Sequence, residues 1–163
     1  MTPSWRFTTI DPIAEFLPAA ARVLRGYNTL CIEHAHTDKD ALELYSRHVS
    51  EDVYWPLRDT ISPHTSLYYC HLTPEFVNGL LRLAGSRDTS SFLWHIRGYD
   101  GQRLIFYSHD ACDGGEVLVS SRFPEGLITQ LACEAGCNAR PDEAKIDWES
   151  IQVKQQQRTR RPS

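Results

Sequence analysis

Apolar residues recur at helical spacing in four segments of the chain, and residues that favour helix ends flank these segments. The four segments are 11–26, 37–49, 73–85 and 124–136. In the first segment, Asp11 and Pro12 suit the positions just before and just inside a helix start. Pro18 lies within the same apolar pattern and predicts a kink or a restart of the helix there.

Shorter apolar runs between these segments are typical of strands. They span 27–36, 66–72, 91–109, 117–121 and 144–153, the last of which also fits a helix. The run 91–109 contains Asp100-Gly101, a dipeptide that favours a two-residue type I′ hairpin turn. That turn predicts a register in which Ile96 faces Ile105 and His95 faces Phe106 across the hairpin.

The order of these elements predicts a single α+β domain, in which an antiparallel meander sheet packs against three to four helices. We expect this domain to span residues 1–153, followed by a basic polar tail at 154–163. The chain has no run of about 18 apolar residues, and its first ten residues do not resemble a secretory signal. Five cysteines at scattered spacing fit a reducing compartment. These features predict a cytoplasmic protein that does not contact membranes, and no pattern predicts a cofactor.

Charge is distributed unevenly along the chain. The net charge is −4, from 17 basic and 21 acidic residues, and four of the basic residues fall in the tail. Residues 1–153 therefore hold 13 basic against 21 acidic residues. An acidic body favours a protein partner with a basic surface over nucleic acid, which only the tail could contact.

The most conspicuous polar cluster is "HAHTD", in which His34, His36 and Asp38 follow the predicted strand 27–36. Residues i and i+2 of a strand share a face, so both imidazoles could bind one metal ion, with Asp38 as a third ligand. The string resembles the metal motif of metallo-β-lactamase-type hydrolases, although Lys39 stands where that family has a further histidine. The hypothesis built on this cluster is a metal ion that activates a bound water, with His71 or His109 as a further ligand from elsewhere in the fold.

A structural interpretation accounts for the same residues. Thr37 followed three positions later by Asp40 is close to a capping-box pattern, and acidic residues are favourable in the first turn of a helix. On this interpretation "HAHTD" is the joint between a strand and a helix, and it binds no metal.

Other residues with reactive side chains lack partners that the sequence could identify. His109 lies at the expected end of a strand, where it could act as a general base or close the loop. Cys112 is near enough in sequence to suggest a Cys/His pair. Cys133 and Cys137 are one helical turn apart, a spacing that favours packing over zinc binding.

The segment between Ser50 and Ser66 carries two prolines and several aromatic and acidic residues, which favours a protein-binding loop. The candidate contact residues are Glu51, Asp52, Tyr54, Trp55 and Asp59. The first hypothesis is therefore a non-enzymatic binding module that occludes a basic partner. Immunity proteins of bacterial toxins do this, and the comparison is by size, charge and class alone. The alternative hypothesis is a small metal-dependent hydrolase at His34, His36 and Asp38.

Overall fold

The computed structural model of the 163-residue chain describes residues 4–9, 11–24, 28–35, 38–50, 64–101 and 103–142. Its helices are α1 (Leu17–Val23), α2 (Lys39–Arg47), α3 (Pro74–Ser86) and α4 (Glu125–Ala135), and a π-helical turn (Pro12–Phe16) leads into α1. Its strands are β1 (Ser4–Thr9), β2 (Asn28–His34), β3 (Ser66–His71), β4 (His95–Asp100), β5 (Arg103–Ser108), β6 (Gly115–Ser120) and β7 (Asn138–Asp142). Within these residues, no helix is both long and apolar enough to cross a bilayer.

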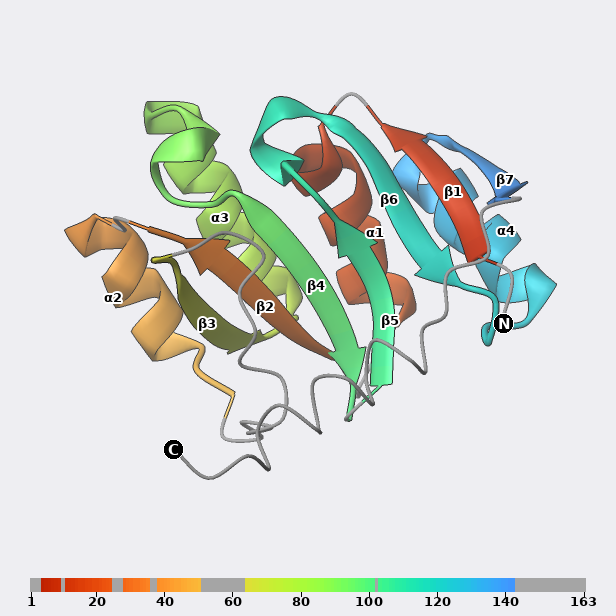
Figure 1. The fold of residues 1–163 in the computed structure, drawn as a ribbon, viewed down its shortest axis with the longest axis horizontal. Coiled ribbons are helices and arrows are strands. Elements are labelled where there is room, and N and C mark those ends of the chain that lie inside the picture. The colour runs from red at the N-terminus through yellow and green to blue at the C-terminus, as the bar shows by residue number, and fades with distance from the viewer. Residues whose placement is uncertain are drawn as a thin grey trace.

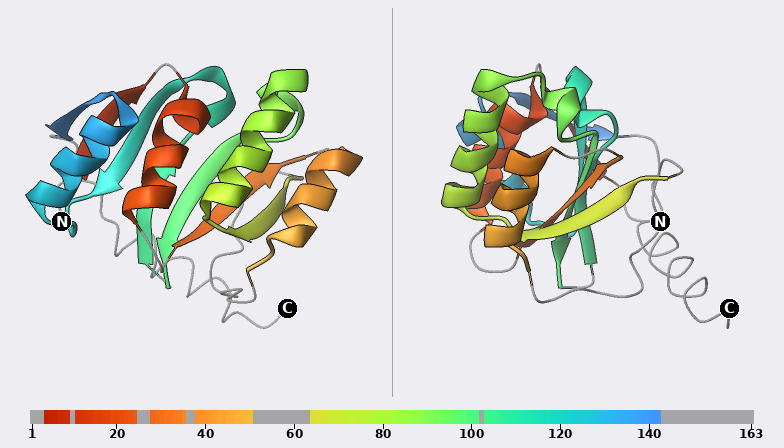
Figure 2. Two further views of the ribbon diagram at one scale, coloured as in Figure 1. Left: turned by 180° about the vertical axis from the view of Figure 1, so that it is seen from behind. Right: turned by 90° about the vertical axis from the view of Figure 1, so that its left-hand side faces the viewer.

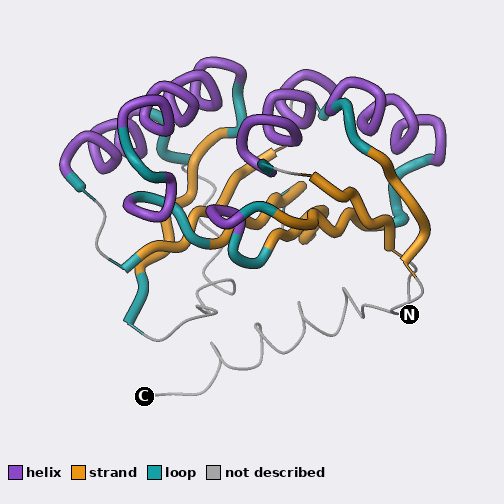
Figure 3. Tube along the Cα trace, turned by 90° about the horizontal axis from the view of Figure 1, so that it is seen from above, coloured by secondary structure: helices purple, strands orange, loops and turns teal. Residues whose placement is uncertain are grey.

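The strands form one open sheet in the order β3-β2-β4-β5-β6-β1-β7, and every pair is antiparallel. All four helices cover the same face of this sheet (Figures 1 and 2). Seen from above, helices and strands form two separate layers (Figure 3). The predicted α+β class is therefore confirmed.

The main core fills the space between the helices and the sheet. Alternate residues of a regular strand point to the same face, so a strand without a bulge contributes every second side chain to this core. Phe7 of β1, Phe16 of the π-helical turn and Phe106 of β5 are fully buried there and pack edge to face. Gly98 of β4 lies beneath the Phe106 ring. A Cβ atom added at Gly98 would overlap this ring, so the position has room only for glycine.

The opposite face of the sheet carries a second set of buried side chains. Cys31, Tyr69, Tyr99 and Leu104 form a smaller apolar cluster. Next to it on β2 and β4, Glu33 and Arg97 form a buried ion pair at 3.0 Å. This face therefore combines apolar and charged groups away from water.

Side-chain caps begin several helices, as the sequence predicts. Asp11 accepts hydrogen bonds from the N–H groups of Ile13 and Ala14, and Thr73 accepts one from Phe76. The cap of α2 is Asp38, one residue later than the predicted Thr37, and Asp38 accepts from the N–H of Ala41. A strand and a helix therefore flank this segment as predicted, with the cap moved by one residue.

The predicted hairpin register is wrong. Asp100 pairs with Arg103 and so flanks the turn instead of forming its first residue, and a β-bulge lies in the ladder between Gly98 and Tyr99. Ile96 consequently faces Ser108 instead of Ile105. The bulge lets two consecutive residues, Ile105 and Phe106, both reach the main core, which a regular strand cannot do.

Two strands were not predicted from the sequence pattern. β1 lies between β6 and β7, and β7 contains Pro141 at the edge of the sheet, where its missing N–H is tolerated. The predicted strand at 144–153, the 154–163 tail and the domain boundary between them lie outside the described residues.

Candidate functional site

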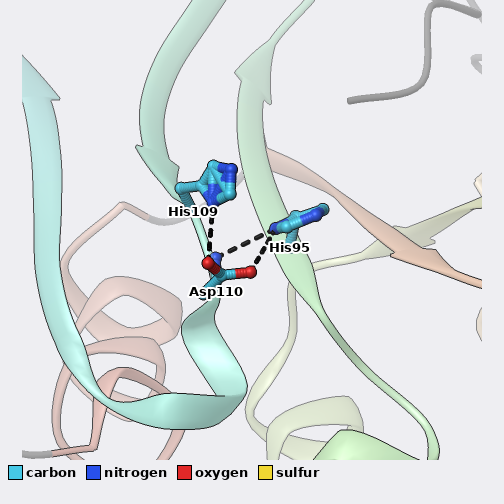
Figure 4. Close-up of side chains that lie close together, drawn as sticks. All are labelled: His95, His109 and Asp110. Carbon is cyan, nitrogen blue, oxygen red and sulfur yellow. Dashed lines mark hydrogen bonds and ion pairs between the residues drawn. The ribbon is translucent and has the colours of Figure 1, made fainter. Parts of the chain in front are cut away.

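Two histidines meet where β4 begins and β5 ends. His95 is the first residue of β4, and His109 directly follows the last residue of β5. Because Ile96 pairs with Ser108, antiparallel pairing brings the two histidines side by side. Their ring centroids are 4.4 Å apart, with the rings inclined by 64° (Figure 4).

Asp110 connects the two rings. Its backbone N–H donates to Nδ1 of His95 over 2.9 Å, and its carboxylate Oδ2 lies 3.1 Å from Nδ1 of His109. Its other carboxylate oxygen, Oδ1, lies 3.5 Å from Nδ1 of His95. Since Nδ1 of His95 accepts a hydrogen bond, neutral His95 carries its proton on Nε2.

The backbone of Asp110 adopts a conformation that most residues avoid. Its φ is 51° and its ψ is 44°, in the left-handed region. Aspartate and asparagine tolerate this region better than other non-glycine residues do. This conformation turns the chain sharply after His109 and aims both the N–H and the carboxylate of Asp110 at the imidazoles.

The three side chains differ in their access to water. The His95 side chain is 3% exposed, whereas those of His109 and Asp110 are 50% and 58% exposed. Burial lowers the pKa of His95, and His109 lowers it further, against the opposing effects of Glu33 and Asp110. His95 therefore remains a neutral imidazole, with a lone pair on Nδ1, at neutral pH.

A surface hollow of about 390 Å³ adjoins the cluster on the side of His109. Its lining residues are Tyr107, His109, Gly114, Gly115, Glu116 and Leu118. Glu116 forms an ion pair with Arg6, which also binds Asp142 at 2.9 Å. The hollow gives solutes a route from water to the exposed side of the cluster.

The structure describes two residues of the predicted "HAHTD" metal cluster, His34 and Asp38, and both take part in structural contacts. His34 is buried on the helix-covered side of β2, its Nε2 lies 2.9 Å from the carbonyl oxygen of Ser90, and its ring packs on Trp94. Asp38 caps α2 and binds Arg87. His36 lies outside the described residues, so a shared metal at these positions remains a prediction.

The electrostatics of Asp38 fit its role as a helix cap. The N–H of Ala41 lowers the pKa of Asp38, and Arg87 adds to this effect, against the cost of partial burial. The carboxylate is therefore held ionised by the helix and by the guanidinium of Arg87.

The predicted Cys/His pair lacks an activated thiol. Burial raises the pKa of Cys112 to about 11, and the nearby Asp113 contributes in the same direction. A thiol of this kind is protonated at neutral pH and is a poor nucleophile. The raised pKa therefore does not favour Cys112 as a nucleophile at this site.

The predicted partner-binding residues Glu51, Asp52, Tyr54, Trp55 and Asp59 lie outside the described residues. The residues on either side of that segment are described. They border an apolar groove of about 580 Å³ between α2 and β3. The groove is lined by Leu42, Tyr45, Ser46, Val49, Thr65, Ser66, Leu67, Tyr68, Tyr69 and Cys70.

Searches of protein-family models, of curated protein sequences and of solved structures each found no match to this chain.

Proposed function

We propose that this chain is a protein-binding module that occludes a partner with a basic surface. The observation that carries the proposal is the apolar groove between α2 and β3. Leu42 and Val49 are the exposed large hydrophobic residues among those that the structure describes, with exposed fractions of 43% and 54%. Both line this groove. Neighbouring exposed apolar groups on an otherwise polar surface are typical of interaction sites.

The groove is continuous in sequence with the predicted aromatic contact segment. Val49 and Ser50 directly precede that segment, and Thr65 follows shortly after it. We propose that a partner bound to the groove also contacts Tyr54 or Trp55, which come five and six residues after Val49 in the sequence. Tyrosine and tryptophan are among the residues that dominate binding energies at protein interfaces.

Charge favours a basic partner. The acidic excess of residues 1–153 attracts positively charged proteins over long range, and Glu51 and Asp52 lie next to the groove in sequence. Opposite charge speeds the first encounter, whereas buried apolar and aromatic contacts slow dissociation. The partner would be inhibited because its basic surface is covered, as in the immunity proteins of bacterial toxins.

The proposal predicts separate effects of salt and of contact variants on the kinetics of the complex. The tag-free chain would be used to capture partners from its source cell, and each captured protein would then be purified. Its association with the chain should slow as salt is raised. The variants Trp55→Ala and Leu42→Ser/Val49→Ser should speed dissociation more than they slow association.

Gln130→Ser is the matched control, because Gln130 is exposed on α4, away from α2 and β3 (Figure 1). This variant should leave both rates unchanged. The proposal fails if the captured protein is acidic, if it keeps its activity in the complex, or if the groove variants bind as the unaltered chain does.

A further inference from the structure

We propose that His95, His109 and Asp110 bind one divalent transition-metal ion, for which zinc is the best match. The proposal is independent of the partner-binding function, because the cluster and the α2–β3 groove share no residue. One ligand atom from each of the three residues lies within 4.8 Å of the other two (Figure 4).

The spacing of these atoms is close to that around a small ion. Oδ2 of Asp110 lies 3.1 Å from Nδ1 of His109, and Oδ1, the other carboxylate oxygen, lies 3.5 Å from Nδ1 of His95. In a tetrahedral zinc site, bonds of about 2.0 to 2.1 Å place neighbouring ligand atoms roughly 3.3 Å apart. The ligand atoms of the two histidines lie within 4.8 Å of each other, so the rings would rotate to bring three donor atoms to one point.

The donor types also match. Neutral imidazoles and a carboxylate suit zinc, and the same set with open positions suits ferrous iron. For Nδ1 of His109 to bind the ion, the proton of the neutral ring must lie on Nε2, which leaves the Nδ1 lone pair for the metal. The ion would also take the lone pair on Nδ1 of His95 that accepts the Asp110 N–H.

The charges around the cluster come from three residues. Asp110 brings its carboxylate to both imidazoles, within 3.1 Å of His109 and 3.5 Å of His95. Glu33 pairs directly across β2 and β4 with His95, and its charge is balanced by Arg97 in the buried ion pair. The exposed side of the cluster adjoins the hollow beside Glu116, so hydrated ions can reach it and water can complete the coordination.

The test is a metal titration of the full-length, tag-free chain after removal of metal with a chelator. Zinc binding is followed by calorimetry, and cobalt, as a coloured substitute for zinc, is followed by visible absorption. The expected result is one ion per chain. His109→Gln and Asp110→Asn should each weaken binding at least about 100-fold, since even outer-shell changes cost about 10- to 100-fold.

Each variant has a matched control. Asp113→Asn makes the same charge change at an exposed position of the same loop, and His71→Gln removes an exposed imidazole on the distant strand β3. Both controls should bind as the unaltered chain does. Asp110→Asn should also fold normally, because asparagine tolerates the left-handed conformation of residue 110. A loss of metal binding in this variant would therefore not be due to misfolding.

Three results would overturn the proposal. The first is no binding at millimolar metal. The second is binding that His109→Gln and Asp110→Asn leave unchanged while circular dichroism shows both variants folded. The third is binding that is lost in His34→Ala/His36→Ala but kept in the two site variants, which would assign the ion to the predicted "HAHTD" cluster instead.

Discussion

Replacing Gly98 by alanine should destabilise the protein strongly, because Phe106 occupies the space above this residue. A methyl group added at Gly98 would lie 2.5 Å from Cδ1 of Phe106 and closer still to Cε1 and Cζ. Ordinary carbon contacts lie near 3.5 to 4.0 Å, so the ring would have to move by about 1 Å or more.

The ring has little room to move. Phe106 is fully buried, and its centroid lies 5.1 Å from that of Phe16, which in turn packs against Phe7. Overpacking a core costs about 1 to 3 kcal/mol, and this overlap involves three ring atoms of a side chain held on its far side. We therefore expect Gly98→Ala to lower the free energy of unfolding by about 3 kcal/mol.

Urea unfolding of four proteins measures this effect: the unaltered chain, Gly98→Ala, Phe106→Leu and the double variant. Leucine lacks Cε1 and Cζ, the two ring atoms nearest the added methyl group, and keeps only Cδ atoms on a more flexible side chain, so Gly98→Ala should cost at least about 1 kcal/mol less in the Phe106→Leu background. Gly126→Ala on α4 is the control, because nothing lies within 4 Å of its added methyl group. That helical change should stabilise by about 0.5 kcal/mol. An equal cost of Gly98→Ala in both backgrounds would refute the overlap with Phe106 as its cause.

Two further predictions concern the α2 cap and the buried thiols. Asp38→Ala should lower the free energy of unfolding by about 1 kcal/mol at pH 7, measured by urea unfolding, because the N–H of Ala41 loses its acceptor. The pKa of Asp38 is lowered on folding, so this difference should be full above about pH 4. It should shrink as the pH falls further and folded Asp38 becomes protonated, and a difference that grows on acidification would contradict the cap. In the folded protein, Cys133 is exposed and should react with a maleimide reagent, whereas burial raises the pKa of Cys31 and of Cys70 to about 12. Mass spectrometry after brief labelling should find Cys31 and Cys70 unmodified, and equal labelling of all three would show that the sheet opens readily.

Much of the helical structure could be predicted from the sequence because its signals are local. Asp11, Thr73 and Gly136 each mark a helix end through their own side chain or backbone conformation, and each does so in the structure. Local signals of this kind depend on a few neighbouring residues, so a single sequence is enough to find them.

The sheet order could not be predicted in the same way. β1 pairs with β6 and β7, strands that lie more than 100 residues further along the chain. The residues of β1 do not indicate which strands it pairs with. The segment Asn138–Asp142 contains a proline and lacks the β-branched and aromatic residues that are typical of a strand. Pairing over such distances is decided by how the whole core packs.

The candidate metal site was missed because of two small shifts in the hairpin. The sequence places Asp100 and Gly101 in the turn, which sets His95 opposite Phe106. In the structure Asp100 belongs to β4 and pairs with Arg103, and the bulge at Gly98 and Tyr99 inserts one more residue on β5. The two shifts together move the residue facing His95 from Phe106 to His109, so a correct turn without the bulge would still have missed the site.

The bulge is explained by core packing, since it allows Ile105 and Phe106 both to be buried. Packing on the helix-covered face of the sheet therefore determines which polar side chains meet at the end of β4, and this link cannot be inferred from the histidines alone.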